Sequence, residues 1–294
     1  MPHHLMIQTR DGSFNTCPEY FFALTNSRWI ETMQMQPDPE ASLDHIQPSL
    51  TDWELMRFLR PFYNIYLKRP PKLYIKENTT QGCHSLHAFE PIPKGSIATE
   101  YLGEWAPEST IHSSYRWGPI DGLHHRNFGG MAEDSFPNMG AFYLYQTKDL
   151  PLRVVFIALE DIGAGEMLTV NYGMNHSVKV NYHDEYALDR LLNFFSTHPL
   201  KKCIERIEQL HTKKRTELGW AKTLELENLT AKIQYIYQTP STLSLLIKEK
   251  IISYEEVFAI YDEAKYRFYI LGFPFQPNLR QAEVIKAIEQ LKSL

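Results

Sequence analysis

The chain has 294 residues, of which 43% are hydrophobic and 22% are charged, and its formal net charge is −5. No apolar run approaches the ~18 residues of a membrane span, and residues 1–10 lack the apolar stretch of a secretory signal peptide. Its three cysteines (Cys17, Cys83 and Cys203) lie far apart, so neither a disulfide framework nor a four-ligand zinc site is predicted. These features predict a soluble, intracellular protein, and they leave cytoplasm and nucleus equally open.

The net charge argues against a nucleic-acid binder held by phosphate contacts. Residues 1–182 hold 14 Lys and Arg against 20 Asp and Glu, whereas residues 183–294 hold 16 against 15. An acidic first part of the chain favours a basic partner by long-range attraction. Plain solubility explains the same charge equally well, and the oligomeric state is not fixed by the sequence.

Residues 1–72 are predicted to form an N-terminal helical segment. Residues 18–33 mix aromatic with polar residues, and T-D-W-E at 51–54 has the spacing of a capping box. The helix that this box would open is expected to end or kink at Pro61, because a proline removes one backbone hydrogen bond. Pro70 and Pro71 close the segment.

Residues 73–182 change in character and are predicted to form a compact β domain with long loops. Short apolar stretches at 72–76, 97–101, 153–159 and 167–172 are separated by Gly, Pro and Asn. No helical period persists over a long window, so these stretches are expected to be strands. The longest apolar run, 154–159, has the length of a buried strand.

Residues 183–294 are predicted to be a helical domain of four to six helices, arranged as a bundle. Ile204, Ile207 and Leu210 recur at helical spacing, as do the apolar residues at 229, 233 and 236, and S-Y-E-E at 253–256 is a second capping-box pattern. Residues 282–291 again place apolar residues at helical intervals. The predicted fold class is therefore α+β, with a β-rich core between two helical parts.

Four groups of motifs occur in the middle part of the chain. The first comprises G-C-H-S at 82–85, K-G at 94–95 and E-Y-L-G-E at 100–104. The second is Y-R-W at 115–117 with I-D-G at 120–122, and the third is G-G-M-A-E-D-S-F-P-N at 129–138. The fourth is A-L-E-D-I-G-A-G-E-M-L-T-V-N-Y-G at 158–173.

In this order the motifs resemble those of the SET family of protein-lysine methyltransferases, over roughly residues 73–175. The resemblance implies a β-rich SET-like core, S-adenosylmethionine as cofactor, no metal, and a basic protein such as a histone as substrate. It implies Tyr172 as the catalytic residue and Tyr101, Tyr115 and Trp117 as walls of the substrate channel. The residues that it implies for cofactor binding are Gly82, Cys83, His84, Tyr115, Ala132 and Glu133.

The chain departs from the family pattern at several of these positions. His84 replaces the second glycine of a G-x-G turn, Ala132 and Glu133 replace an Asn-His pair, and Asn171 replaces an aspartate. The cysteine-rich zinc segment that follows many SET domains is missing. These departures leave open a second hypothesis, a SET-like interaction module without catalysis, and a third, an unrelated structural protein with β and helical parts.

The residue types suit methyl transfer to an amine. The reaction needs alignment, a dry channel and a neutral amine, and both burial and a nearby positive charge disfavour a lysine ammonium. Aromatic walls attract the cationic chain, and a tyrosine hydroxyl orients the amine. The alternative for Tyr172 is a core tyrosine bonded to a backbone carbonyl. For His84 and the pair His124-His125 a metal site lacks a full ligand set, and Glu133-Asp134 is expected to be a solvated loop.

Overall fold

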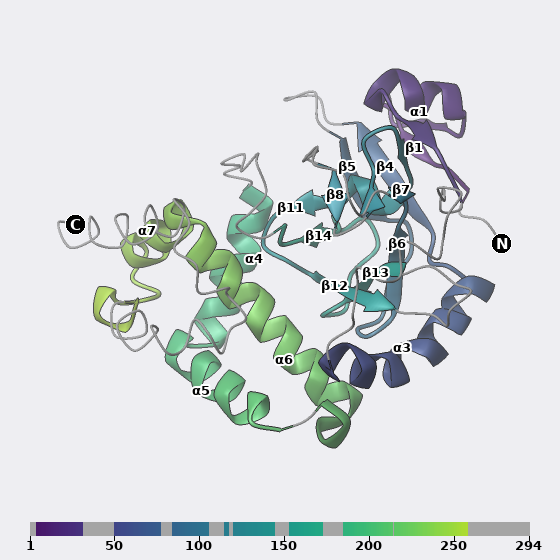
Figure 1. Ribbon diagram of the computed structural model, residues 1–294. Helices are drawn as coiled ribbons and strands as arrows, with labels where there is room; N and C mark the ends of the chain where they lie inside the picture. Colours follow the sequence, from purple (N-terminus) through teal and green to yellow (C-terminus); the bar gives the residue numbers. More distant parts are fainter. Residues whose placement is uncertain are drawn as a thin grey trace. The chain divides into compact units, whose positions relative to one another are not determined.

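The computed structural model is of mixed α+β class, as predicted from the sequence (Figure 1). It describes residues 4–31, 50–77, 84–105, 115–117, 120–144, 153–172, 185–213 and 215–257. The chain divides into two compact units, which are described separately below. The first comprises Met1–Glu133 and Asn138–Val170, and the second Asp134–Pro137 and Asn171–Leu294.

The first unit contains a sheet in which the N-terminal residues join the central motifs. Its strand order is β2-β1-β4-β5, with β1 parallel to β4 and the other pairs antiparallel. The bounds are β1 Ile7–Gln8, β2 Phe14–Asn15, β4 Leu73–Glu77 and β5 His84–Ala88. The predicted strand at 72–76 is thus confirmed. Ile75 pairs with Ile7 on one side and with Leu86 on the other, and all three side chains are buried.

A second sheet of the first unit carries the longest apolar run. It has the antiparallel order β12-β13-β6, with β6 Ile97–Tyr101, β12 Met139–Leu144 and β13 Arg153–Ala158. Residues 154–158 of β13, the central strand, are buried on both faces. The two strands predicted over 97–101 and 153–159 are therefore confirmed.

Short elements complete the first unit. One sheet has the order β7-β9-β8 (Glu104–Trp105, Ile120–Asp121 and Arg116–Trp117), and β3 (Arg28–Trp29) pairs with β10 (His125–Arg126). β11 (Glu133–Asp134), of which only Glu133 belongs to this unit, pairs with β14 (Thr169–Val170), the part of the predicted strand at 167–172 that is formed. The remaining elements are the helix α1 (Pro18–Thr25) and the 3-10 turn η1 (Phe128–Met131).

The prediction for residues 1–72 is only partly right. α1 and α3 (Leu50–Lys68) are helical, but β1, β2 and β3 lie in the same stretch. α3 also continues through Pro61 to Lys68. α3 begins at Leu50, one residue before Thr51, and the side chains of the predicted capping box at 51–54 lie outside the described part of the chain. The helix packs beside β12 and β6 through the buried side chains of Leu59, Tyr63 and Tyr66, and this packing offsets the hydrogen bond lost at the proline.

The second unit is helical, as predicted (green in Figure 1). Its helices are α4 Glu185–Thr197, α5 Leu200–His211, α6 Arg215–Gln238 and α7 Pro240–Lys248. The residues chosen for their helical spacing, Ile204, Ile207 and Leu210 on α5 and those at 229, 233 and 236 on α6, all lie in one buried core. α6 is kinked at Gly219, whose φ is 72°.

Two further sequence expectations concern this unit. Ser253 and Glu256 form the predicted capping box, because the hydroxyl of Ser253 accepts from the amide of Glu256 and the Glu256 carboxylate accepts from the amide of Ser253, both at 3.0 Å. The helix expected over 282–291 lies outside the described residues. No helix in the described part of the chain is long and apolar enough to cross a membrane. The predicted domain boundaries at 72 and 182 stay predictions.

Candidate functional site

The motif fragments of the first unit are tied to one another by backbone and side-chain hydrogen bonds. The amide of Lys94 donates to Asp161 Oδ1 at 2.8 Å, and the amide of Gly95 donates to the carbonyl of Ala158 at 2.8 Å. Gly95 has a φ of +83°, which favours glycine at this turn. The K-G turn and the D-I-x-x-G string, 67 residues apart, therefore form one assembly.

Asn138, the last residue of the third fragment, ties that fragment to the fourth. Its side chain is fully buried, donates to the carbonyl of Met167 at 2.8 Å and accepts from the amide of Thr169 at 2.8 Å. Its own carbonyl accepts from the amide of Leu159 at 2.8 Å. The asparagine amide thus satisfies backbone groups on the string that leads to Tyr172.

Asn127 ties η1 to the E-Y-L-G-E string in the same way, a role that was not predicted from the sequence. Its buried amide accepts from the backbone N–H of Leu102 at 3.1 Å and of Gly129 at 3.2 Å, and donates to the carbonyl of Glu100 at 2.7 Å. Gly129 lies so close to this strand that a Cβ would be 2.3 Å from the Glu100 carbonyl oxygen. A single Asn between Arg126 and Phe128 carries little signal in a sequence, because its role depends on these backbone partners elsewhere in the chain.

The three residues expected to line the substrate channel are close together. The hydroxyl of Tyr101 donates to the carbonyl of Tyr115, and the ring centroids of Tyr101 and Trp117 are 6.2 Å apart. Trp117 also packs edge-on against Phe156 at 5.2 Å. Tyr101 is buried and burial raises the pKa of its hydroxyl, whereas Tyr115 is 38% exposed. Of the three, Tyr115 therefore offers the most surface to a ligand.

The expected cofactor residues are only partly described. Gly82 and Cys83 lie outside the described residues. His84 begins β5, its Nε2 lies 3.3 Å from the carbonyl of Leu24, and its Nδ1 is buried with no hydrogen-bond partner in the described part of the chain. β5 packs beside η1, which ends directly before the buried Ala132. The backbone N–H of Glu133 donates to the carbonyl of Leu168 at 3.3 Å.

Tyr172 belongs to the second unit, where its backbone N–H donates to Asp134 Oδ1 at 3.0 Å. Both residues are half-buried. The expectation of a solvated loop at Glu133-Asp134 is therefore wrong: the two residues form β11, and Asp134 fixes the backbone of the tyrosine that the resemblance makes catalytic. Adjacent residues in a strand do point to opposite sides, but this alternation could not predict that Asp134 would bind Tyr172, which lies 38 residues further along the chain.

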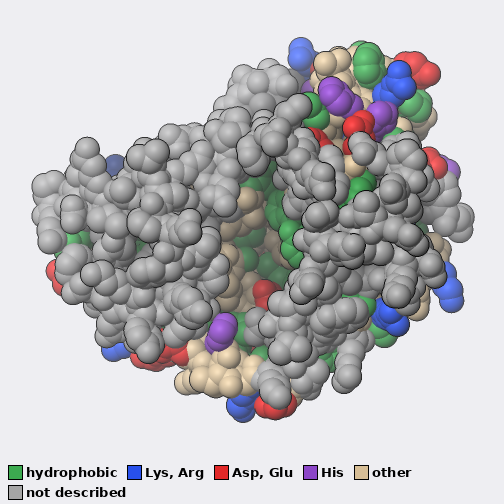
Figure 2. Space-filling view, in the orientation of Figure 1, with side chains coloured by type: hydrophobic (Ala, Val, Ile, Leu, Met, Phe, Trp, Pro, Cys, Tyr) green, Lys and Arg blue, Asp and Glu red, His purple; other side chains and the backbone are tan. Residues whose placement is uncertain are grey.

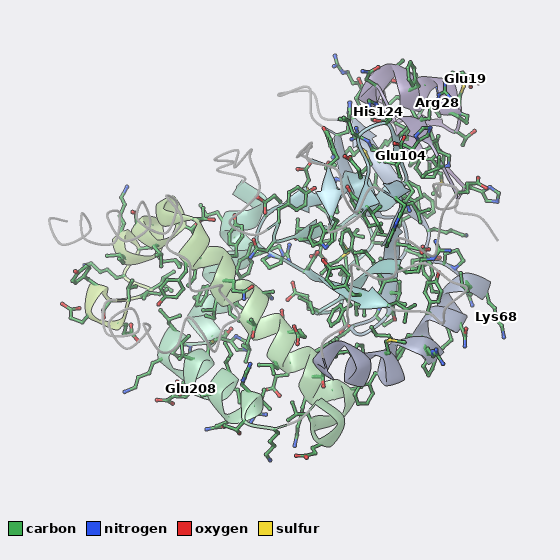
Figure 3. All side chains as sticks on the ribbon, in the orientation of Figure 1. Glu19, Arg28, Lys68, Glu104, His124 and Glu208 are labelled. Carbon is green, nitrogen blue, oxygen red and sulfur yellow. The ribbon has the colours of Figure 1, made fainter. Side chains whose placement is uncertain are left out.

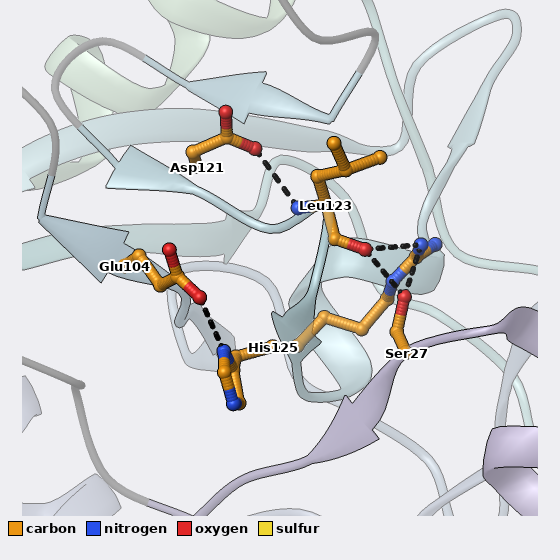
Figure 4. Close-up of polar contacts among 6 residues, drawn as sticks. Ser27, Glu104, Asp121, Leu123 and His125 are labelled. Carbon is orange, nitrogen blue, oxygen red and sulfur yellow. Dashed lines mark hydrogen bonds and ion pairs between the residues drawn. The ribbon is translucent and has the colours of Figure 1, made fainter. Parts of the chain in front are cut away.

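The histidine pair forms a polar contact at the surface of the first unit. His125 Nδ1 bonds to Glu104 Oε1, the last residue of the E-Y-L-G-E string, and the carbonyl of His124 accepts from the amide of Arg28 (Figures 3 and 4). Figure 2 shows histidine side chains beside acidic ones at the upper right, over the region of α1. Among the described residues, no group of three or more His, Cys, Asp or Glu is arranged to hold a metal ion.

Comparisons with known proteins give matches only among solved structures. No protein-family model matches the sequence, and no curated protein matches it. The chain is similar to KRYPTONITE, crystallised with mCHH DNA, an H3 peptide and SAH, at 26% identity over 36% of this chain and 24% of that one, with a TM-score of 0.32. It is similar to ATXR5, crystallised with mono-methylated histone H3.1, at 12% identity over 57% and 89% of the two chains, with a TM-score of 0.40.

A third match is the methyltransferase domain of the human histone-lysine N-methyltransferase SETMAR, at 20% identity over 36% of this chain and 46% of that domain, with a TM-score of 0.29. The resemblance of this chain to the SET family is carried by its own motifs at 82–104, 115–122, 129–138 and 158–173. The match spans about a quarter of the KRYPTONITE chain.

Proposed function

We propose that the chain is an S-adenosylmethionine-dependent protein-lysine N-methyltransferase that acts on a basic protein such as a histone. The observation that carries the proposal is the string at 158–173, which ends in Tyr172 and Gly173. Two side-chain contacts support it. Asn138 binds the backbone of Thr169 within this string, and Asp134 accepts from the backbone N–H of Tyr172.

Methyl transfer requires the protein mainly to align the reacting groups and to provide favourable electrostatics. In the proposed reaction the lone pair of the lysine nitrogen would form the new N–C bond, the electron pair of the C–S bond would stay on the cofactor's sulfur, and the amine proton would pass to solvent. In this proposal the hydroxyl of Tyr172 orients the amine, and Asp134 limits the backbone freedom of Tyr172. Tyr101, Tyr115 and Trp117 form the aromatic wall along which the lysine chain lies.

The residues proposed for the cofactor fit a polar ligand in one respect. The buried Nδ1 of His84 has no partner among the described residues, and a buried polar atom of this kind is normally satisfied. S-adenosylmethionine, when bound, supplies the methyl group on a positively charged sulfur. His84, the backbone at Ala132 and Glu133, and Tyr115 are the residues proposed to hold it, together with Gly82 and Cys83.

The acidic balance of residues 1–182 supports a basic protein as substrate, because a negative surface attracts Lys- and Arg-rich segments over long distances. This attraction predicts that the Michaelis constant for a basic substrate rises with salt, since screening shortens its range to about 8 Å at 0.15 M ionic strength.

A SET-like module without catalysis is the second candidate function. The departures at His84 and at Ala132-Glu133 favour it, because the resemblance assigns these positions to the cofactor. Ala132 is 3% exposed and has no polar side-chain atom to offer. In this case the chain would bind a basic protein without turning it over.

Transfer of labelled methyl groups from S-adenosylmethionine to mixed core histones tests the proposal. The wild type should label histones, and Tyr172→Phe should lower kcat by about 100-fold, the usual loss when one preorganised polar group is removed. Tyr20→Phe is the matched control, because Tyr20 lies on α1 and its hydroxyl binds Glu77. Equal activity of wild type and Tyr172→Phe would contradict the role of Tyr172. A wild type that binds histones without labelling them would favour the module.

A further inference from the structure

Arg126 is a buried positive charge without an acidic partner among the described residues. It is 3% exposed, and its Nη2 donates to Ser27 Oγ and to the carbonyl of Leu123 at 3.3 Å (Figure 4). Its Nε is buried without an acceptor, and none of its polar contacts is to a carboxylate. The positive charge of the guanidinium therefore lies inside the first unit.

The two oxygen atoms that Arg126 contacts have hydrogen-bond partners other than Arg126. Ser27 Oγ donates to the carbonyl of Leu123 at 2.6 Å, so each of these groups keeps a partner if Arg126 is replaced. Burying an ion without a counter-ion is unfavourable, and an apolar side chain of similar length would fill the same space. The charge is therefore poorly explained by the stability of the fold.

The guanidinium faces the ring of Tyr115. Its Cζ lies 3.8 Å from the ring centroid, within the range of a cation–π contact. The carbonyl of Tyr115 accepts from the amide of Gly122 at 2.8 Å and from the hydroxyl of Tyr101. One face of the Tyr115 ring thus contacts the guanidinium of Arg126, and hydrogen bonds to its carbonyl fix the backbone of Tyr115. The residue is nevertheless 38% exposed.

We propose that Arg126 is a positioning residue that makes Tyr115 select the neutral amine of a substrate lysine over its ammonium form. The role rests on the methyltransferase function proposed above. A ring that binds a cation on one face attracts a second cation weakly, because the two charges repel across it. Two unit charges about 8 Å apart at an effective dielectric constant of about 20 repel by the equivalent of roughly 1.5 pH units, and the carboxylate of Asp121, which acts on Tyr101 in the direction opposite to Arg126, offsets part of this repulsion. The neutral amine is also the form that accepts a methyl group.

The pH dependence of kcat for histone methylation tests this role, because kcat reports ionisations in the enzyme–substrate complex. In Arg126→Met the acid limb of the kcat profile should move up by about one pH unit, and KM at pH 7 should fall because the ammonium form binds better. Arg126→Lys keeps a cation under the ring and should keep the wild-type limb. Arg28→Met, at an exposed arginine on β3, is the matched control and should leave both parameters unchanged.

Thermal unfolding of the same variants gives a readout that does not depend on activity. Arg126→Met should melt at or above the wild-type temperature, since Ser27 and Leu123 remain bonded to each other. A fall of several degrees in Arg126→Met would show that the charge stabilises the fold and would overturn the proposal. So would an unshifted kcat profile in an active Arg126→Met. A wild type that methylates no basic protein would overturn the proposed function itself, and the role of Arg126 with it.

Discussion

Replacing Arg153 by methionine tests the buried carboxylate of the E-Y-L-G-E string. Glu100 is 6% exposed, and its Oε1 lies 3.2 Å both from Arg153 Nη1 and from the hydroxyl of Tyr63. Burial raises the pKa of Glu100, although Arg153 acts in the opposite direction. Removing one partner of a buried ion pair costs about 3–5 kcal/mol. The Arg153 side chain is 19% exposed and Tyr63 remains as a donor, so we expect a loss of about 2 kcal/mol at pH 7.5.

The sign of the pH dependence follows from the raised pKa. A carboxyl with a higher pKa in the folded state binds a proton there first, so its contribution to stability falls as pH rises from the ordinary Glu value of about 4.3 through the folded pKa. Without Arg153 the pKa of Glu100 should rise further. The loss of stability in Arg153→Met should therefore be smaller at pH 5 than at pH 7.5, because a protonated Glu100 needs no counter-charge.

Urea unfolding followed by tryptophan fluorescence at the two pH values measures this loss. The matched control is the double variant Arg153→Met with Glu100→Gln, which has no charge at this position. It should regain more than half of the stability lost at pH 7.5 and show little difference between the two pH values. An equal loss in Arg153→Met at both pH values, or a double variant no more stable than the single one, would refute the reasoning.

Three other substitutions test single contacts. Asp134→Ala should lower kcat on core histones about tenfold, because the backbone N–H of Tyr172 loses its side-chain acceptor. Asp134→Asn, which keeps a side-chain oxygen, should retain most of the activity. Asn127→Ala should lower the free energy of unfolding by about 3 kcal/mol in urea titrations, because two buried N–H groups lose their acceptor; a loss below 1 kcal/mol would contradict this. Ser253→Ala should cost about 1 kcal/mol and speed hydrogen exchange at the amide of Glu256; unchanged exchange would argue against the cap.

The elements that could be predicted from the sequence are those whose burial is regular. The apolar run in β13 is buried on both faces, so its length and composition alone identify it as a strand. α5 carries one apolar stripe, which produces the period seen in the sequence, and the residues at 229, 233 and 236 have the same helical spacing within the more widely buried α6. β1 and β2 have two residues each, too few for any period, and they are strands only because β4 lies beside β1.

α3 shows where local signals fail. The capping-box pattern at 51–54 and the proline at position 61 both describe the energy of an isolated helix. In the folded chain Leu59, Tyr63 and Tyr66 are buried on either side of the proline, and this tertiary packing decides the length of the helix.

Of the candidate site, the sequence predicts which residues matter better than what each one does. Tyr101, Tyr115 and Trp117 were chosen as one group and are in contact, but Tyr101 uses its hydroxyl to hold the carbonyl of Tyr115. Asp134 was not predicted as a site residue, because its partner Tyr172 is 38 residues away. Arg126 was not predicted either, because its partner is the face of the Tyr115 ring. Contacts of this kind depend on the tertiary structure and leave no local pattern.

The matched motif residues mostly assemble the backbone. Within E-Y-L-G-E, Glu100 is a buried ion-pair partner, a Cβ on Gly103 would lie 2.3 Å from the Asp121 carbonyl oxygen, and Glu104 binds His125. A chain that kept the fold and lost catalysis would keep the buried ion pair of Glu100 and the close approach at Gly103, since neither contact involves a ligand. Their presence therefore supports the SET-like fold more strongly than it supports activity. What separates an enzyme from an inactive module must lie in side chains that the fold does not require, namely the hydroxyl of Tyr172 and the guanidinium of Arg126, which contacts no carboxylate among the described residues.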